Sequence, residues 1–107
     1  MKDILSELNE IINLRKEKGS ANSYTKNLII SGSEKCAEKF GEEAVELIIA
    51  ASSPQNNKIH IQNEAADVIY HLMVLLSSKD INLETVLNIL EQRMGTSGLD
   101  EKTRRKK

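Results

Sequence analysis

Four acidic residues, spaced as two pairs, are the strongest candidates for chemistry in this 107-residue chain. Glu43 and Glu46 are three positions apart, and so are Glu64 and Asp67. Residues three apart on a helix share a face. A polar segment around Pro54 lies between the pairs, which predicts a short connection between two antiparallel helices. All four carboxylates can then point at one spot.

Converging carboxylates repel one another strongly at low dielectric unless a cation lies between them. An all-oxygen ligand set favours Mg²⁺, with Mn²⁺ as the alternative ion. Each pair alone is also typical of a solvated helix face. The metal site is favoured because Glu46 and Asp67 directly precede apolar runs, where half-buried carboxylates need partners.

Two neighbours of the first pair are candidates for direct roles in catalysis. Glu42 precedes Glu43, so it could be a further metal ligand, a base that holds a water nucleophile, or an ordinary surface carboxylate. Lys39 lies four residues before Glu43. It could contact a phosphate beside the metal, or form a simple i,i+4 ion pair.

Basic side chains elsewhere are candidates for binding an anionic substrate. Arg15 and Arg93 each lie near the end of an apolar-periodic helix, where a cation either stabilises the helix dipole or binds phosphate. His71 follows Asp67 by four residues and shares its face. It is either a core residue or a partner that orients Asp67 or a substrate group.

A small polar loop precedes the second expected helix. Ser23, Tyr24 and Thr25 lead into its N-terminus, and Thr25 can cap a helix that runs to Ile30. The N–H groups of a helix N-terminus favour anions, although three residues alone are a weak signal.

Apolar periodicity predicts an all-α fold, an antiparallel bundle of four to five helices in one domain over residues 1–95. No useful stretch alternates with a period of two, so no sheet is expected. The expected helices run from about Lys2 to Lys18, from Thr25 to Ile30, from the cap Ser33 to before Pro54, from the cap Asn57 past Leu76, and from the cap Asn82 to Gly95. On the third helix the expected core-facing residues are Ala37, Phe40, Ala44, Leu47, Ile48 and Ala51.

The fourth helix is nearly all apolar from Val68 to Leu76, which predicts burial on more than one side. A small bundle cannot easily supply that burial alone, so we expect a homodimer through this helix. Residues 96–107 are polar, end in a basic cluster, and are expected to form a tail.

Composition excludes several classes of protein. A net charge of −1 predicts no strong attraction to nucleic acid or to anionic membranes, and only three aromatic residues argue against base stacking. The basic cluster Arg104–Lys107 would give at best weak, salt-sensitive binding to nucleic acid. Cys36 is the single cysteine, and no apolar run reaches the ~20 residues of a membrane span. The chain is expected to be cytoplasmic.

The paired acid motifs resemble those of the all-α nucleoside-triphosphate pyrophosphatases, the MazG-like superfamily. Within it, the chain resembles the phosphoribosyl-ATP pyrophosphatases of histidine biosynthesis. The matching stretches are Ser23–Thr25, Gly32, Lys39–Glu46, Ala50–Ala51, Asn63–Asp67, Tyr70–Leu72, Val74–Leu76, Arg93 and Ser97–Lys102.

The resemblance implies hydrolysis of phosphoribosyl-ATP to phosphoribosyl-AMP and pyrophosphate. It implies Mg²⁺ held by the two acid pairs, with Glu42 and Lys39 at adjoining catalytic positions. Some members carry a second domain that holds zinc through cysteines, and this chain lacks the length and the cysteines for it. The residues expected to contact substrate are Arg15, Ser23, Tyr24, Thr25, His71, Arg93 and Lys102.

Two other functions remain open from sequence. One is a house-cleaning pyrophosphatase of the same superfamily that acts on other nucleoside triphosphates, although the Ser23–Thr25 loop and the tail argue against it. The other is a non-catalytic dimeric helical module whose acids are merely exposed. That module would show neither saturable Mg²⁺ binding nor release of pyrophosphate.

Overall fold

The computed structural model of the chain describes residues 3–95, and the regular elements in that range are five helices with no strand. They are α1 (Ile4–Lys18), α2 (Tyr24–Ile30), α3 (Ser33–Ser52), α4 (Lys58–Ser78) and α5 (Leu83–Met94). The expected all-α class is confirmed. The expectations for the tail at 96–107, including Lys102 and Arg104–Lys107, lie outside the described residues.

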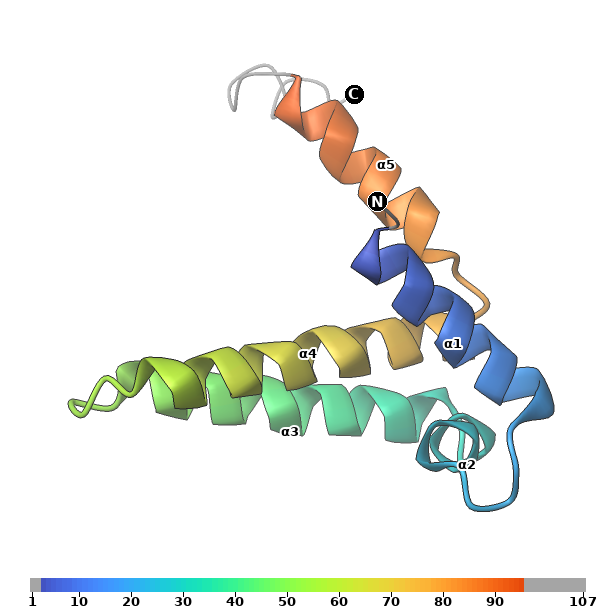
Figure 1. Cartoon of the computed structure of the whole chain (residues 1–107), viewed down its shortest axis with the longest axis horizontal. Helices are drawn as coiled ribbons and strands as arrows, with labels where there is room; N and C mark the ends of the chain where they lie inside the picture. The colour runs from blue at the N-terminus through green and yellow to red at the C-terminus, as the bar shows by residue number, and fades with distance from the viewer. Residues whose placement is uncertain (1–2, 96–107) are drawn as a thin grey trace.

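Helices α3 and α4 form a long antiparallel hairpin, and they lie side by side along their length (Figure 1). Helix α3 ends just before Pro54, as expected. Asn57 caps α4, because its side chain accepts a hydrogen bond of 3.1 Å from the backbone N–H of His60. Asn56 takes up a left-handed conformation with φ of 50°, which asparagine tolerates better than most residues.

The face of α3 that meets α4 follows a spacing of four and three residues. Its buried or half-buried positions include Cys36, Phe40, Glu43, Leu47 and Ala50, which is the spacing of a coiled-coil contact. Glu43 therefore occupies a position in this helix–helix contact that an apolar side chain would ordinarily fill.

Part of the expected core face of α3 is exposed. Ile48 is 61% exposed, and Ala37 and Ala51 are also exposed, so their assignment to the core was wrong within one protomer. The physical reason is that α4 covers only one side of α3, and the described residues supply no second helix over the other side.

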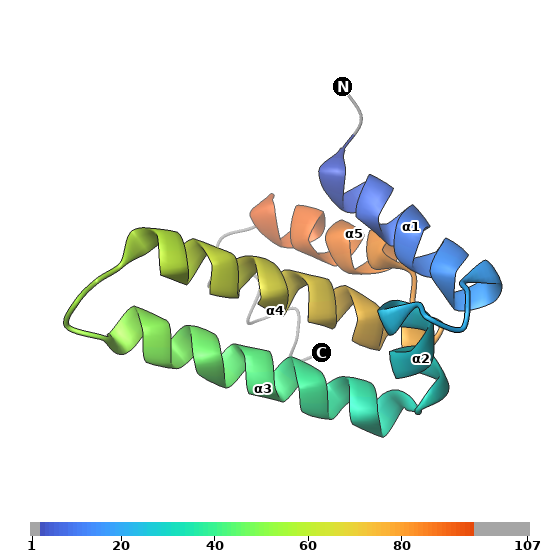
Figure 2. The same cartoon turned by 60° about the horizontal axis from the view of Figure 1, so that its bottom comes forward.

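The hydrophobic core lies at one end of the hairpin. It is built from Ile12, Leu28, Cys36, Met73, Val74 and Leu83. Helices α1 and α5 lie on the side of α4 away from α3, and α2 lies beside the start of α3 (Figures 1 and 2). The middle of the hairpin, where the acid pairs lie, is therefore held mainly by the contact between α3 and α4.

Three helix starts differ from expectation by one or two residues, and the first is α1, which begins at Ile4 after the cap Asp3 rather than near Lys2. Ser23, not Thr25, caps α2, because its hydroxyl accepts a hydrogen bond of 3.2 Å from the N–H of Lys26. Gly32 precedes α3 with a φ of 106° that favours glycine, and Ser33 is the first helical residue. At α2 the cause is packing, because the buried Thr25 hydroxyl bonds to Tyr70 on α4 instead of capping its own helix.

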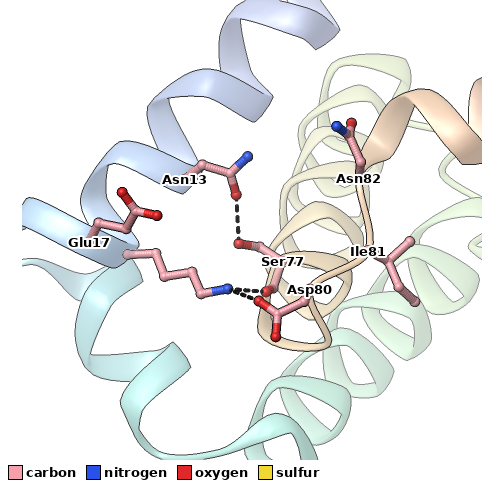
Figure 3. Close-up of a pocket in the computed structure, with 7 residues that line it drawn as sticks. Asn13, Glu17, Ser77, Asp80, Ile81 and Asn82 are labelled. Carbon is pink, nitrogen blue, oxygen red and sulfur yellow. Dashed lines mark hydrogen bonds and ion pairs between the residues drawn. The ribbon is translucent and has the colours of Figure 1, made fainter.

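Lys16 ties α1 to the end of α4, where Ser77 and Asp80 lie across from Asn13 (Figure 3). Its ammonium group donates to the carbonyl oxygen of Ser77 at 2.8 Å and to the carboxylate of Asp80 at 2.6 Å. The Ser77 hydroxyl in turn donates to the side-chain oxygen of Asn13 at 2.9 Å. These groups line a polar cavity of about 250 Å³.

Among the described residues, no helix has the length and apolar character to cross a membrane.

Candidate metal centre and its supporting hydrogen bonds

Three of the four predicted acids meet between α3 and α4. Glu43, Glu64 and Asp67 each offer a carboxylate oxygen, and these oxygens lie within 4.8 Å of one another. Glu46 is outside this group and is exposed, but its charge acts on Glu43. We call Glu43, Glu64 and Asp67 the acidic group.

The acidic group is electrostatically unfavourable without a cation. Burial raises the pKa of the Glu43 carboxyl, and the negative charges of Glu46 and Asp67 raise it further. The imidazole of His71 acts in the opposite direction. The protein alone therefore disfavours the ionised form of Glu43.

Glu64 is the most enclosed member of the acidic group. Its side chain is 15% exposed, and its Oε2 atom is buried without a hydrogen-bond partner among the described residues. Its Oε1 atom lies 3.9 Å from Nδ1 of His60, one helical turn earlier. A buried carboxylate oxygen without a partner is costly, and a divalent cation among the three carboxylates would satisfy it. The residues present therefore fit a hard cation with oxygen ligands.

Lys39 and Glu42 form an ion pair with each other. The Lys39 ammonium lies 3.2 Å from Oε2 of Glu42, one turn along α3. Lys39 thus pairs with Glu42 at i,i+3, and not in the i,i+4 pair with Glu43 that the sequence offered. The hydrogen bond that Lys39 donates to Glu42, together with the negative charge of Glu42, raises the pKa of Lys39. The pair is partly exposed and directly precedes Glu43 in the chain.

Two side-chain hydrogen bonds join α2 to α4. The Tyr24 hydroxyl lies 3.1 Å from Nε2 of His71, and the Thr25 hydroxyl bonds to the hydroxyl of Tyr70. Neighbouring residues of one helix thus pair with neighbouring residues of the other. Nδ1 of His71 lies 2.9 Å from the backbone carbonyl oxygen of Asp67, so this contact leads to the acidic group.

The predicted substrate-contacting residues therefore fall into different settings. Thr25 is 1% exposed and His71 is 7% exposed, so both side chains are enclosed by the protein. Tyr24 is 53% exposed. Arg15 lies on α1 and Arg93 on α5, outside the hairpin that carries the acidic group.

Sequence reasoning missed two contributors. His60 lies four residues before Glu64, and this i,i+4 spacing on one helix was the available signal. The other is Tyr70, whose hydrogen bond to Thr25 depends on the packing of α2 on α4. No local sequence pattern predicts that contact.

Comparison with known proteins gives consistent matches. The profile of a family described as phosphoribosyl-ATP pyrophosphohydrolase matches residues 5–94. A phosphoribosyl-ATP pyrophosphatase of Rhodobacter capsulatus is 50% identical over 101 residues, which cover 94% of this chain and 96% of the relative. Phosphoribosyl-ATP pyrophosphatase 1 of Rhodopseudomonas palustris is 47% identical over 103 residues, covering 96% and 94%. The Bradyrhizobium diazoefficiens protein of the same name is 46% identical over 102 residues, covering 95% and 94%.

Proposed function

Because the chain belongs to the phosphoribosyl-ATP pyrophosphohydrolase family, we propose that it hydrolyses phosphoribosyl-ATP to phosphoribosyl-AMP and pyrophosphate, a step of histidine biosynthesis. The observation that carries this proposal is the acidic group, which lies within the matched region. Its three carboxylate oxygens lie close together, as a site for a cation bound to phosphates requires.

The acidic group would hold Mg²⁺, or Mn²⁺ in its place, through Glu43, Glu64 and Asp67, with Glu46 beside Glu43 as a further ligand. The chemistry that such an ion supplies is neutralisation of the phosphate oxygens and polarisation of the phosphorus under attack. The partial burial of Glu64 keeps part of this site dry, which strengthens each charge interaction in it.

Glu42 is our candidate for the base. Its carboxylate would accept a proton from the attacking water while the new P–O bond forms at the α-phosphorus. The bond between the α-phosphorus and the bridging oxygen then breaks, and its electron pair leaves with pyrophosphate. Lys39, whose ammonium already contacts Glu42, would orient the Glu42 carboxylate and stabilise the departing negative charge.

For substrate binding we propose the accessible members of the predicted set. Among the described residues these are Ser23, Arg15 and Arg93, and Lys102, which lies outside them, remains a candidate by its place in the sequence. Thr25 and His71 are enclosed and hydrogen-bonded, so their contribution to binding is indirect.

We also propose that the active unit is a homodimer. Val45, Ile48 and Ile49 on α3 are each more than half exposed, and their spacing places them on one helix face. On α4, Ile59 and Ile69 are exposed as well. A second copy covering these stripes would bury them. It would also bring side chains from outside the hairpin to each acidic group.

The function is tested by following pyrophosphate release from phosphoribosyl-ATP with and without Mg²⁺, beside dCTP, dUTP and ATP. We expect release that depends on Mg²⁺ and is fastest with phosphoribosyl-ATP. Faster turnover of dCTP or dUTP would assign the chain to a house-cleaning role. No release from any nucleotide would support the non-catalytic helical module.

A further inference from the structure

The contact between α2 and α4 ends at a member of the acidic group. Tyr24 on α2 reaches His71 on α4, and His71 reaches back one turn to the carbonyl oxygen of Asp67. The rings of Tyr24 and Tyr70 both stand edge-on to the His71 imidazole, with centroids 6.0 Å and 5.1 Å away. The imidazole is therefore held at both nitrogens and beside two aromatic rings.

The hydrogen bonds fix which nitrogen of His71 carries the proton when the ring is neutral. A carbonyl oxygen only accepts, so Nδ1, which lies 2.9 Å from the Asp67 carbonyl oxygen, must donate. Nε2 then carries a lone pair and accepts from the Tyr24 hydroxyl at 3.1 Å. The chain of donors runs in one direction, from Tyr24 through His71 to Asp67.

Burial separates this chain from ordinary surface contacts. His71 is only 7% exposed, so both ring nitrogens need partners inside the protein. Tyr24 is 53% exposed, and water could satisfy its hydroxyl without His71. Loss of the Tyr24–His71 bond would therefore leave a buried nitrogen of His71 without a partner, whereas the Tyr24 hydroxyl could bond to water. The effect of the bond is felt at His71 and at the turn of α4 that carries Asp67.

We propose that Tyr24 is a positioning residue, which sets Asp67 in the acidic group by holding His71 in the Nδ1-protonated form. His71 holds the backbone carbonyl of Asp67 and not its carboxylate. Loss of a partner bonded directly to a metal ligand typically lowers metal affinity or activity by about 10–100-fold, so we expect an effect at the lower end of that range. The proposal rests on the proposed function only in taking the acidic group to be the metal site.

The first test is spectroscopic and needs neither metal nor substrate. The tautomer of His71 is read from ¹⁵N chemical shifts of the intact protein at alkaline pH, where imidazole is neutral. We expect the Nδ1-protonated form in the wild-type protein. A predominantly Nε2-protonated ring would overturn the proposal.

The second test measures Mn²⁺ affinity by electron paramagnetic resonance. Tyr24→Phe removes only the hydroxyl, and we expect it to weaken Mn²⁺ binding roughly 10-fold. His71→Asn keeps a donor near the place of Nδ1, whereas His71→Gln keeps an acceptor near the place of Nε2. We expect both variants to weaken Mn²⁺ binding, because His71→Asn loses the bond to Tyr24 and His71→Gln loses the bond to the Asp67 carbonyl. The double variant Tyr24→Phe/His71→Asn should be no weaker than His71→Asn alone, because both changes break the same link.

Tyr70→Phe is the matched control. It removes the Thr25–Tyr70 bond, which joins the same two helices but does not pass through His71. We expect Mn²⁺ affinity to stay within about threefold of wild type even where the melting temperature falls. Equal losses in Tyr70→Phe and Tyr24→Phe would reduce Tyr24 to a general packing contact and overturn the proposal.

Activity separates this proposal from the proposed function. Tyr24→Phe should lower kcat for phosphoribosyl-ATP more than it raises KM, because a displaced metal ligand acts on the reacting phosphorus. A Tyr24→Phe effect confined to KM would contradict positioning and make Tyr24 a substrate contact. If the wild-type protein does not hydrolyse phosphoribosyl-ATP at all, the tautomer and Mn²⁺ results still decide the positioning role.

Discussion

Glu43 is the residue at which stability and function oppose each other. It occupies an α3–α4 contact position, and burial raises the pKa of its carboxyl above the ordinary value of 4.5. Folding without metal therefore makes the ionised form of Glu43 less favourable than it is in the unfolded chain. The contribution of Glu43 to stability is fully present below pH 4.5 and is lost as the pH rises through the folded-state pKa.

Glu43→Gln should therefore stabilise the metal-free protein at neutral pH while it abolishes turnover. We expect a rise in melting temperature of roughly 2–4 °C at pH 7 and no rise at a pH well below 4.5, measured by circular dichroism in EDTA. Retained turnover in this variant would remove Glu43 from the mechanism. An unchanged or lower melting temperature at pH 7 would contradict the claim that ionised Glu43 destabilises the metal-free protein.

Asp80 gives a prediction of opposite sign. The hydrogen bond and charge of Lys16 lower the pKa of Asp80 below its ordinary 3.8. The resulting stability is present above pH 3.8 and is lost as the pH falls through the folded-state pKa. Asp80→Asn keeps a side chain that tolerates the left-handed φ of 57° at this position but removes the charge.

For Asp80→Asn we expect a fall in melting temperature of about 2 °C at pH 7, smaller in 1 M salt because the carboxylate is exposed. Thermal scans at both salt concentrations measure it. A fall that salt leaves unchanged would contradict an electrostatic role for the pair.

At the scale of the elements, Gly41 lies inside α3 where glycine weakens a helix. Sequence alone suggests that another backbone or a ligand approaches there, yet a Cβ built at Gly41 meets nothing within 4 Å. Gly41→Ala should therefore stabilise the protein by about 0.5–1 kcal/mol, as denaturant unfolding would measure. If the variant instead loses stability or activity, the open space beside Gly41 is occupied by a second protomer or by substrate in the active protein.

Helix identities follow well from the sequence because their signals are local. The cap at Asn57 and the stop before Pro54 depend on neighbouring residues alone, and both are confirmed. The start of α2 was misplaced because Ser23 and Thr25 both belong to the favoured cap residue types. Only packing decides between them, since Thr25 is needed inside to meet Tyr70.

The acidic group was predictable in part for the same reason. Spacing on each helix indicated which carboxylates share a face, and three of the four meet. The register between α3 and α4 decides which carboxylates meet, and no local sequence pattern predicts that register. The hydrogen bond between Tyr24 and His71 could not be predicted, because these residues are 47 positions apart in the chain.

At the scale of the whole molecule, the chain is more extended than a self-sufficient domain. Its radius of gyration is 16.3 Å, against about 13 Å for a compact domain of this length. The exposed apolar stripe at Val45, Ile48 and Ile49 lies on the projecting hairpin. Both features agree with the proposed homodimer.

Ile48→Glu tests that homodimer. We expect the wild-type chain to sediment at about twice its 12.0 kDa mass and the variant to sediment as a monomer, because a charge would have to be buried at the interface. Ile4→Glu, at an equally exposed position on α1, is the matched control and should remain dimeric. A monomeric wild-type chain would contradict the proposed assembly.

The central claim is that Glu43, Glu64 and Asp67 together hold the divalent ion that supports hydrolysis of phosphoribosyl-ATP. The most direct measurement is the rate of pyrophosphate release from phosphoribosyl-ATP as Mg²⁺ is titrated, for the wild-type protein and for Asp67→Asn. We predict saturable activation by Mg²⁺ in the wild type, and at least a 100-fold lower rate in Asp67→Asn, the order expected on loss of transition-state charge stabilisation. Wild-type release that persists in EDTA, or an Asp67→Asn rate equal to wild type, would contradict the claim.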